Sequence, residues 1–189
     1  MQVLFIVFAV AFVLSFIPLT YLAIRGYRRF RGARVVTCPE THEPVAVELD
    51  AGHAAATSLT GEADLRLKSC TRWPERQDCG QECLAQIEEA PEGCLVRTML
   101  TDWYQGEHCA LCGQEFGQIL WSDRKPVLMS PQRVRMEWDE VAPETLPEVL
   151  KTHYRVCWNC HMAESFRALH PDLVLEDPLH KEARRSSSR

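Results

Sequence analysis

The chain begins with a long apolar stretch that has no polar face. No charged side chain occurs from Val3 to Ile24, and the stretch is dominated by Val, Leu, Ile, Phe and Ala, with mild interruptions at Ser15, Pro18 and Thr20. At about 1.5 Å per residue this stretch is roughly 33 Å long, close to the roughly 30 Å thickness of a bilayer core. The pattern therefore predicts one transmembrane helix from Val3 to Ile24.

Basic residues follow this stretch and predict its orientation. Arginine is retained on the cytoplasmic side of a membrane, and the only charge before the stretch is the α-amino group. A cleaved signal peptide is the alternative, but it needs basic residues before the apolar run and a small-residue cleavage site. We therefore expect an uncleaved anchor in the inner (plasma) membrane of a bacterium, with the N-terminus outside and the rest of the chain cytoplasmic. The basic residues are Arg25, Arg28, Arg29, Arg31 and Arg34.

Beyond the anchor the pattern changes to short elements of mixed type. Apolar residues in short runs between turn signals predict strands, and periodic apolar stripes with caps predict helices. Asp78 followed by Gln81 is typical of a capping box and predicts a helix from Cys79 to Glu89, which would place Cys79 and Cys83 on one face. Strands are expected at 34–39, 44–49, 65–70, 118–121, 127–129 and 134–138, and further helices near 94–103, 143–153 and 161–169.

These elements predict an α+β fold class, with one N-terminal transmembrane helix followed by a small cysteine-rich, metal-stapled cytoplasmic region. The 155 residues that follow Arg34 suit one ordinary domain or two small ones. The expected segments are a transmembrane anchor (1–25), an Arg-rich juxtamembrane linker (26–37), a cysteine-rich α/β subdomain (38–105), a zinc-finger-like subdomain (106–175) and a disordered tail (176–189).

The charge of the chain limits its partners. It has 21 Lys plus Arg and 26 Asp plus Glu, and five of the arginines lie in residues 1–34 with no acidic residue. The remainder therefore carries 16 − 26 = −10, which disfavours nucleic acid as a ligand. We expect instead a membrane, contacted through Val3–Ile24, and a protein partner in the membrane or cytoplasm.

Two CxxC pairs carry the sharpest chemical signal. Cys109 and Cys112 are followed by Gly113, and Cys157 and Cys160 lie beyond a spacer of 44 residues. A CxxC turn places two sulfurs on one side of a tight loop, and two such turns complete a tetrahedral site with zinc–sulfur bonds of about 2.3 Å. In a reducing compartment such spacings favour metal binding over disulfides. The four cysteines are therefore the predicted ligands of a structural zinc ion.

Three alternatives use the same residues. Cys157 to His161 matches the CxxCH pattern of covalent c-type haem attachment, with His161 as the proximal ligand, but that chemistry occurs outside the cytoplasm and leaves Cys109 and Cys112 unexplained. Four thiolates can also hold an iron–sulfur cluster. A strand, a CxxC and a helix in succession are also the local setting of a redox dithiol, although the βαβ pattern is missing.

The order of elements around the two pairs resembles a known type of fold. A knuckle at Cys109 and Cys112 precedes β-runs, and a second CxxC at Cys157 and Cys160 leads into a helix. Residues 108–170 thus resemble a treble-clef or zinc-ribbon finger. The resemblance implies a metal site and no particular activity, because such fingers serve many functions.

The other cysteines form a looser group. Their spacings match no zinc pattern, so buried free thiols are one interpretation and a second metal site is the other. Histidines at 108 and 161 flank the CxxC pairs and could support the first site from outside the ligand shell. The candidate second metal site consists of Cys70, Cys79, Cys83 and Cys94, with Cys38 upstream.

These observations favour a non-enzymatic protein. No Ser/His/Asp arrangement, phosphate-binding loop or HExxH motif occurs, and a closed four-thiolate site leaves no coordination position for a substrate. We expect an adaptor or an accessory subunit of a membrane complex, in which zinc shapes a protein-binding surface. The alternative is a membrane-tethered redox or electron-transfer protein that uses haem, an iron–sulfur cluster or the CxxC dithiol.

Overall fold

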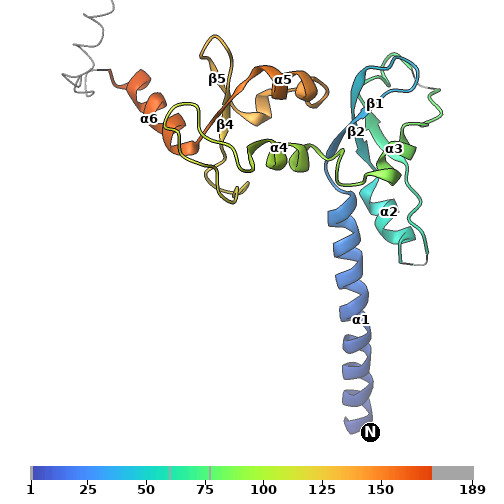
Figure 1. The fold of residues 1–189 in the computed structure, drawn as a ribbon. Helices are drawn as coiled ribbons and strands as arrows, with labels where there is room; N and C mark the ends of the chain where they lie inside the picture. Colours follow the sequence, from blue (N-terminus) through green and yellow to red (C-terminus); the bar gives the residue numbers. More distant parts are fainter. Residues whose placement is uncertain (1, 60, 77, 172–189) are drawn as a thin grey trace, which may run out of the picture. The chain divides into compact units, whose positions relative to one another are not determined.

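The computed structural model describes residues 2–59, 61–76 and 78–171 and has helices and strands in mixed order (Figure 1). The predicted α+β character is confirmed. The chain forms two compact units: an N-terminal unit of residues 1–103 and 141–151, and a C-terminal unit of residues 104–140 and 152–189. The predicted disordered tail, 176–189, lies outside the described residues.

The first helix, α1, runs from Gln2 to Phe30. Within the part of the chain that the structure describes, no helix is both long enough and apolar enough to cross a membrane. This finding overturns the predicted transmembrane helix Val3–Ile24, and with it the inner-membrane location and cytoplasmic body inferred from it.

The end of α1 is capped by a buried arginine. The last carbonyls of a helix lack partners within the helix. Arg34 is fully buried, and its Nη1 donates to the carbonyl oxygens of Phe30 at 2.8 Å and Gly32 at 3.1 Å, while Nη2 donates to that of Arg29 at 3.0 Å. Burial lowers the pKa of this guanidinium, and Cys94 beside it opposes the shift. Arg34 therefore fastens α1 to the first strand.

A three-stranded antiparallel sheet forms the centre of the N-terminal unit. Its strands are β1 (Ala33–Thr37), β2 (Pro44–Leu49) and β3 (Leu67–Cys70), in the order β1-β2-β3. The predicted strands at 34–39 and 44–49 are thus confirmed, and the third begins two residues later than expected. Val36, Val47 and Ile87 are among the buried residues of the core below this sheet.

Four short helices complete this unit. Helix α2 (Ala51–Thr57) packs against α1 where Gly26 lacks a side chain, since a Cβ at Gly26 would lie 3.4 Å from the Cα of Ala55. Helices α3 (Leu84–Glu89) and α4 (Val96–Tyr104) follow β3. A 3-10 turn (Pro143–Thr145) precedes α5 (Leu146–Thr152), and Trp103 Nε1 donates to the carbonyl oxygen of Leu150 at 2.9 Å.

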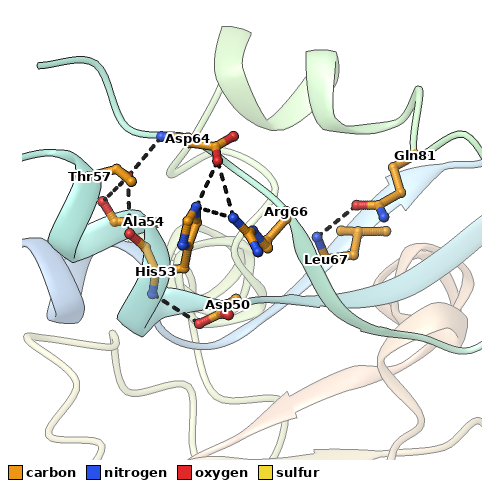
Figure 2. A network of polar contacts seen from close by, with 8 residues as sticks. All are labelled: Asp50, His53, Ala54, Thr57, Asp64, Arg66, Leu67 and Gln81. Atoms are coloured by element: carbon orange, nitrogen blue, oxygen red, sulfur yellow. Dashed lines mark hydrogen bonds and ion pairs between the residues drawn. The ribbon is translucent and has the colours of Figure 1, made fainter.

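Polar contacts fix the long connection between α2 and β3 (Figure 2). Asp50 caps α2 by accepting from the His53 backbone N–H at 3.0 Å, and His53 Nε2 lies 2.7 Å from Asp64 Oδ2. Arg66 Nη2 lies 3.4 Å from the same carboxylate oxygen, and the pKa of Asp64 is lowered by its hydrogen bonds with His53 and Arg66. Figure 2 also shows Gln81, whose Oε1 accepts from the Leu67 backbone N–H at 2.9 Å. These contacts hold the start of β3 between α2 and the turn at Gln81.

The predicted helix from Cys79 to Glu89 is wrong in its first half. Gln81 has a φ of 57°, in the left-handed region, so the chain turns there and α3 begins only at Leu84. The expected capping box does not form because the Gln81 side chain bonds Leu67 instead. Cys79 and Cys83 therefore do not share a helix face.

The C-terminal unit is a second antiparallel sheet with one long helix. Strand β4 (Val127–Met129) lies between β5 (Arg135–Met136) and β6 (Tyr154–Val156), and β6 leads into α6 (Trp158–Leu169). A 3-10 turn spans Trp138–Glu140. The predicted strand at 127–129 is confirmed, the one at 134–138 is shortened to two residues, and 118–121 forms no strand. The helix predicted at 161–169 begins three residues earlier.

We expect Arg34→Leu to lower the free energy of unfolding by about 3 kcal/mol, because three carbonyl oxygens at the end of α1 lose charged donors in a buried site. Arg31→Leu is the matched control: this arginine is exposed, so its loss should change stability by less than about 0.5 kcal/mol. Urea unfolding of the full chain, followed by circular dichroism, measures both. Equal stabilities of the two variants would contradict the capping role.

Candidate metal centre

Four cysteine sulfurs gather in the C-terminal unit. The Sγ atoms of Cys109, Cys112, Cys157 and Cys160 all lie within 4.8 Å of one another, and those of Cys112 and Cys157 are 3.8 Å apart. Bonds of about 2.3 Å to a tetrahedral zinc ion would place sulfurs about 3.8 Å apart. The group could therefore hold a metal ion with little movement of the cysteines.

Cys109 begins a tight loop that backbone hydrogen bonds hold together at both ends. Its N–H donates to the carbonyl oxygen of Gln114 at 2.9 Å, and the N–H of Gly113 donates to the carbonyl oxygen of Cys109 at 2.8 Å. Gly113 has a φ of 71°, which side-chain-bearing residues adopt at a cost. The Ala110 N–H donates to the carbonyl oxygen of Arg155 at 2.8 Å, and this bond ties the loop to β6. We call this loop, residues 109–114, the first knuckle.

The second cysteine pair lies where β6 becomes α6. Cys157 is the N-cap of α6, and its carbonyl oxygen accepts from the His161 N–H at 3.0 Å. The Cys157 N–H donates to the sulfur of Cys109 at 3.3 Å. Cys160 lies in the first turn of the helix, where the helix dipole favours negative charge. Strand, helix start and knuckle thus direct four sulfurs to one point.

The surroundings of the sulfurs set their protonation. Burial raises the pKa of Cys109, but the backbone N–H groups of Cys157, Cys112 and Leu111 outweigh it and lower that pKa to about 7. Burial raises the pKa of both Cys157 and Cys160, and hydrogen bonds with neighbouring thiols raise that of Cys160 further. Burial thus disfavours the charged forms of Cys157 and Cys160, which a bound cation would favour.

Two histidines flank the site without joining it. Neither His108 nor His161 belongs to the gathered ligand atoms among the described residues. His108 is exposed, and its backbone forms an isolated antiparallel β-bridge with Glu115. His161 Nε2 lies 3.8 Å from Glu137 Oε1, while its buried Nδ1 has no hydrogen-bond partner within the described part of the chain.

The other predicted cysteines lie in the N-terminal unit. Cys70, Cys79 and Cys83 line one cavity, but Cys94 does not. The Cys94 sulfur donates to the carbonyl oxygen of Ala90 at 3.3 Å and lies beside Arg34. Cys38, which the sequence analysis placed upstream in the same looser group, lines the same cavity as the first three. A second metal site in this unit stays a prediction.

Comparison with known proteins adds no further assignment. No protein-family model, curated protein or solved structure matches the chain. The resemblance of residues 108–170 to a treble-clef or zinc-ribbon finger therefore stays a prediction. The gathered sulfurs define the site as a four-cysteine group that could bind a metal ion.

We expect Gly113→Ala to weaken metal binding by the first knuckle by about 1 kcal/mol, a roughly fivefold rise in dissociation constant. A Cβ at Gly113 would meet no atom within 4 Å, so the cost comes from its positive φ alone. Gly117→Ala is the control, because Gly117 is equally open but is not among the positive-φ glycines. Competition with a chromophoric chelator measures both, and equal affinities would contradict the strained-turn explanation.

Proposed function

We propose that Cys109, Cys112, Cys157 and Cys160 bind one zinc ion as a structural site. The observation that carries this proposal is the gathering of four sulfurs at a spacing that suits tetrahedral zinc. Zinc bound by four protein ligands keeps no open position for a substrate. The proposed function is therefore to shape a surface rather than to catalyse a reaction.

The small core of the C-terminal unit supports a folding role for the metal. One of its hydrophobic clusters has only four buried residues, and Cys109 is one of them. A core of this size contributes little stability alone, whereas zinc binding in small modules contributes about 10–16 kcal/mol. The ion would hold the knuckle, β6 and α6 together where apolar packing is sparse.

Helix α6 offers the surface that this module would present. None of its residues is buried, and Met162, Phe166 and Leu169 are exposed by 46%, 51% and 76%. Their spacing of four and three residues places them on one helix face. Exposed apolar patches mark protein contacts, and the acidic charge of the chain disfavours nucleic acid. We therefore propose an adaptor or accessory subunit whose partner is another protein.

A redox protein is the competing function. Haem attached at Cys157 and Cys160 would leave Cys109 and Cys112 without a role, although both lie in the same group. Iron in a four-thiolate site fits the same geometry as zinc. The visible spectrum separates these cases, because haem and iron–sulfur centres absorb visible light and zinc does not.

The test of the zinc site is the metal content of the purified full chain. We expect a colourless protein with bound zinc, and Cys157→Ser should lose one equivalent while Cys94→Ser loses none. Removal of the metal by a chelator should unfold the C-terminal unit, seen as loss of near-ultraviolet circular dichroism from Trp138 and Trp158. A Soret band, a brown protein with iron and sulfide, or an unchanged zinc content in Cys157→Ser would overturn the proposal.

The adaptor role predicts a contact through α6 that depends on zinc. A photo-crosslinking amino acid at position 166 should give one dominant adduct with another protein in cells, and Cys157→Ser should abolish it. The same amino acid at Gln132, an exposed position in the same unit, is the control and should give no such adduct. An adduct equally strong from both positions, or one unaffected by Cys157→Ser, would contradict a zinc-shaped contact surface.

A further inference from the structure

The N-terminal unit has a cavity lined by four cysteines. The cavity has a volume of about 60 Å³, large enough for a metal ion. Its lining includes Cys38 from the β1–β2 turn, Cys70 from the end of β3, and Cys79 and Cys83 from the segment before α3. With the four ligands of the first site, these residues account for eight of the nine cysteines, and Cys94 is the ninth.

The loop that follows Cys38 repeats the backbone of the first knuckle. The Cys38 N–H donates to the carbonyl oxygen five residues later, at Glu43, with a distance of 2.9 Å. The N–H four residues later, at His42, donates to the Cys38 carbonyl oxygen at 2.8 Å. His42 has a φ of 58°, and so takes the conformation that Gly113 takes in the first knuckle. We call residues 38–43 the second knuckle.

The hydrogen bonds to the cysteine sulfur are repeated as well. In both knuckles the backbone N–H groups two and three residues after the cysteine lower its pKa: Leu111 and Cys112 for Cys109, and Glu40 and Thr41 for Cys38. Such N–H groups are the usual donors to a thiolate bound to metal. The second knuckle therefore has the backbone of a metal-binding turn in a sequence that lacks the CxxC spacing.

Three side-chain contacts hold the other cysteines around the second knuckle. Gln86 of α3 bonds both backbone groups of Thr37, accepting at 3.0 Å and donating at 2.7 Å, and so fixes the helix that Cys83 caps. Gln81, between Cys79 and Cys83, bonds Leu67 at the start of β3. The Ala46 N–H donates to Thr71 Oγ1 at 3.2 Å, and this bond fixes the end of β3 next to Cys70.

Positive charge lies at the same cavity. Arg72 Nη1 donates to the sulfur of Cys38 at 3.0 Å, and Arg72 and Arg76 both line the cavity and pair with Glu40 at 3.4 Å and 3.1 Å. A divalent ion with four thiolates carries a net charge of −2. The two arginines offset this charge only in part, because Glu40 and Glu82 also line the cavity and Asp78 pairs with Arg76. The Cys79 sulfur also accepts from the Gln81 N–H at 3.4 Å.

We propose that Cys38, Cys70, Cys79 and Cys83 form a second metal site, for zinc or another thiolate-preferring divalent ion. On binding, each ligand is a thiolate and any thiol proton passes to solvent. Among the described residues only the first site has all its ligand atoms within 4.8 Å, so the second site must close on binding. The turn at Cys79 and Gly80 belongs to no helix or strand, so we expect it to be the segment that moves on binding. Cys94 is the spare thiol.

The test counts metal ions in the full chain, and it does not depend on the first site. Wild type should bind two zinc ions, Cys38→Ser and Cys70→Ser one each, Cys94→Ser two, and Cys38→Ser combined with Cys157→Ser none. Failure of the first site alone would instead appear as one zinc ion in wild type, one in Cys157→Ser and none in Cys38→Ser. Equal zinc contents in wild type and Cys38→Ser, or loss of an ion in Cys94→Ser but not in Cys38→Ser, would overturn the proposed ligand set.

Two further measurements need no variant, so a variant that fails to fold cannot mislead them. They are cobalt binding and thiol labelling of the wild-type protein. Two equivalents of cobalt should each give thiolate-to-metal charge-transfer bands of similar intensity. Iodoacetamide should modify Cys94 in the metal-loaded protein and reach Cys38 only after chelation. Rapid modification of Cys38 in the metal-loaded protein would assign it as a reactive thiolate beside Arg72 and would overturn its role as a ligand.

Discussion

The C-terminal unit brings four cysteine sulfurs to one point, where burial disfavours the charged forms of two of them, Cys157 and Cys160. The cysteines of the first knuckle and those at the start of α6 are separated by 44 residues of sequence, and each pair supplies two sulfurs to the same point. Backbone N–H groups stabilise the thiolate of Cys109, while burial works against those of Cys157 and Cys160. The sheet and helix of this unit thus hold four sulfurs in a group that could bind a metal ion.

The N-terminal unit uses a related frame with more apolar support. Its sheet lies over a core of buried aliphatic residues, and Arg34 ties that sheet to α1 through three carbonyl oxygens. Loss of a metal would therefore remove a smaller fraction of the stability of this unit than of the C-terminal unit. In the proposed second site, the end of β3 and the segment before α3 would supply the sulfurs that the second knuckle lacks.

Local sequence patterns predicted the parts of the molecule that local chemistry controls. The CxxC spacing and Gly113 predicted the first knuckle, and apolar runs predicted β1, β2 and β4. Prediction failed where a distant residue decides the structure. The Gln81 side chain bonds Leu67, and the helix expected from Cys79 does not form there. Cys38 and Cys70 line the same cavity only because β2 pairs with both β1 and β3. Helix α2 was missed because its Ala-rich sequence lacks an apolar stripe, although Asp50 caps it.

The preference for zinc over haem was first argued from a cytoplasmic location, which rested on the overturned membrane helix. That preference now rests on the geometry of the sulfurs.

The N-terminal unit is discontinuous in sequence, and this has a consequence for how the protein is made. Residues 141–151 complete the unit, and Trp103 contacts Leu150 across the intervening 46 positions of chain. A ribosome synthesises domains from the N-terminus onward. The N-terminal unit therefore cannot finish folding until after Cys109 and Cys112 have left the ribosome. Two cysteines of the first site are thus exposed to the cell before their partners Cys157 and Cys160 exist, and the supply of metal during translation becomes part of the folding problem.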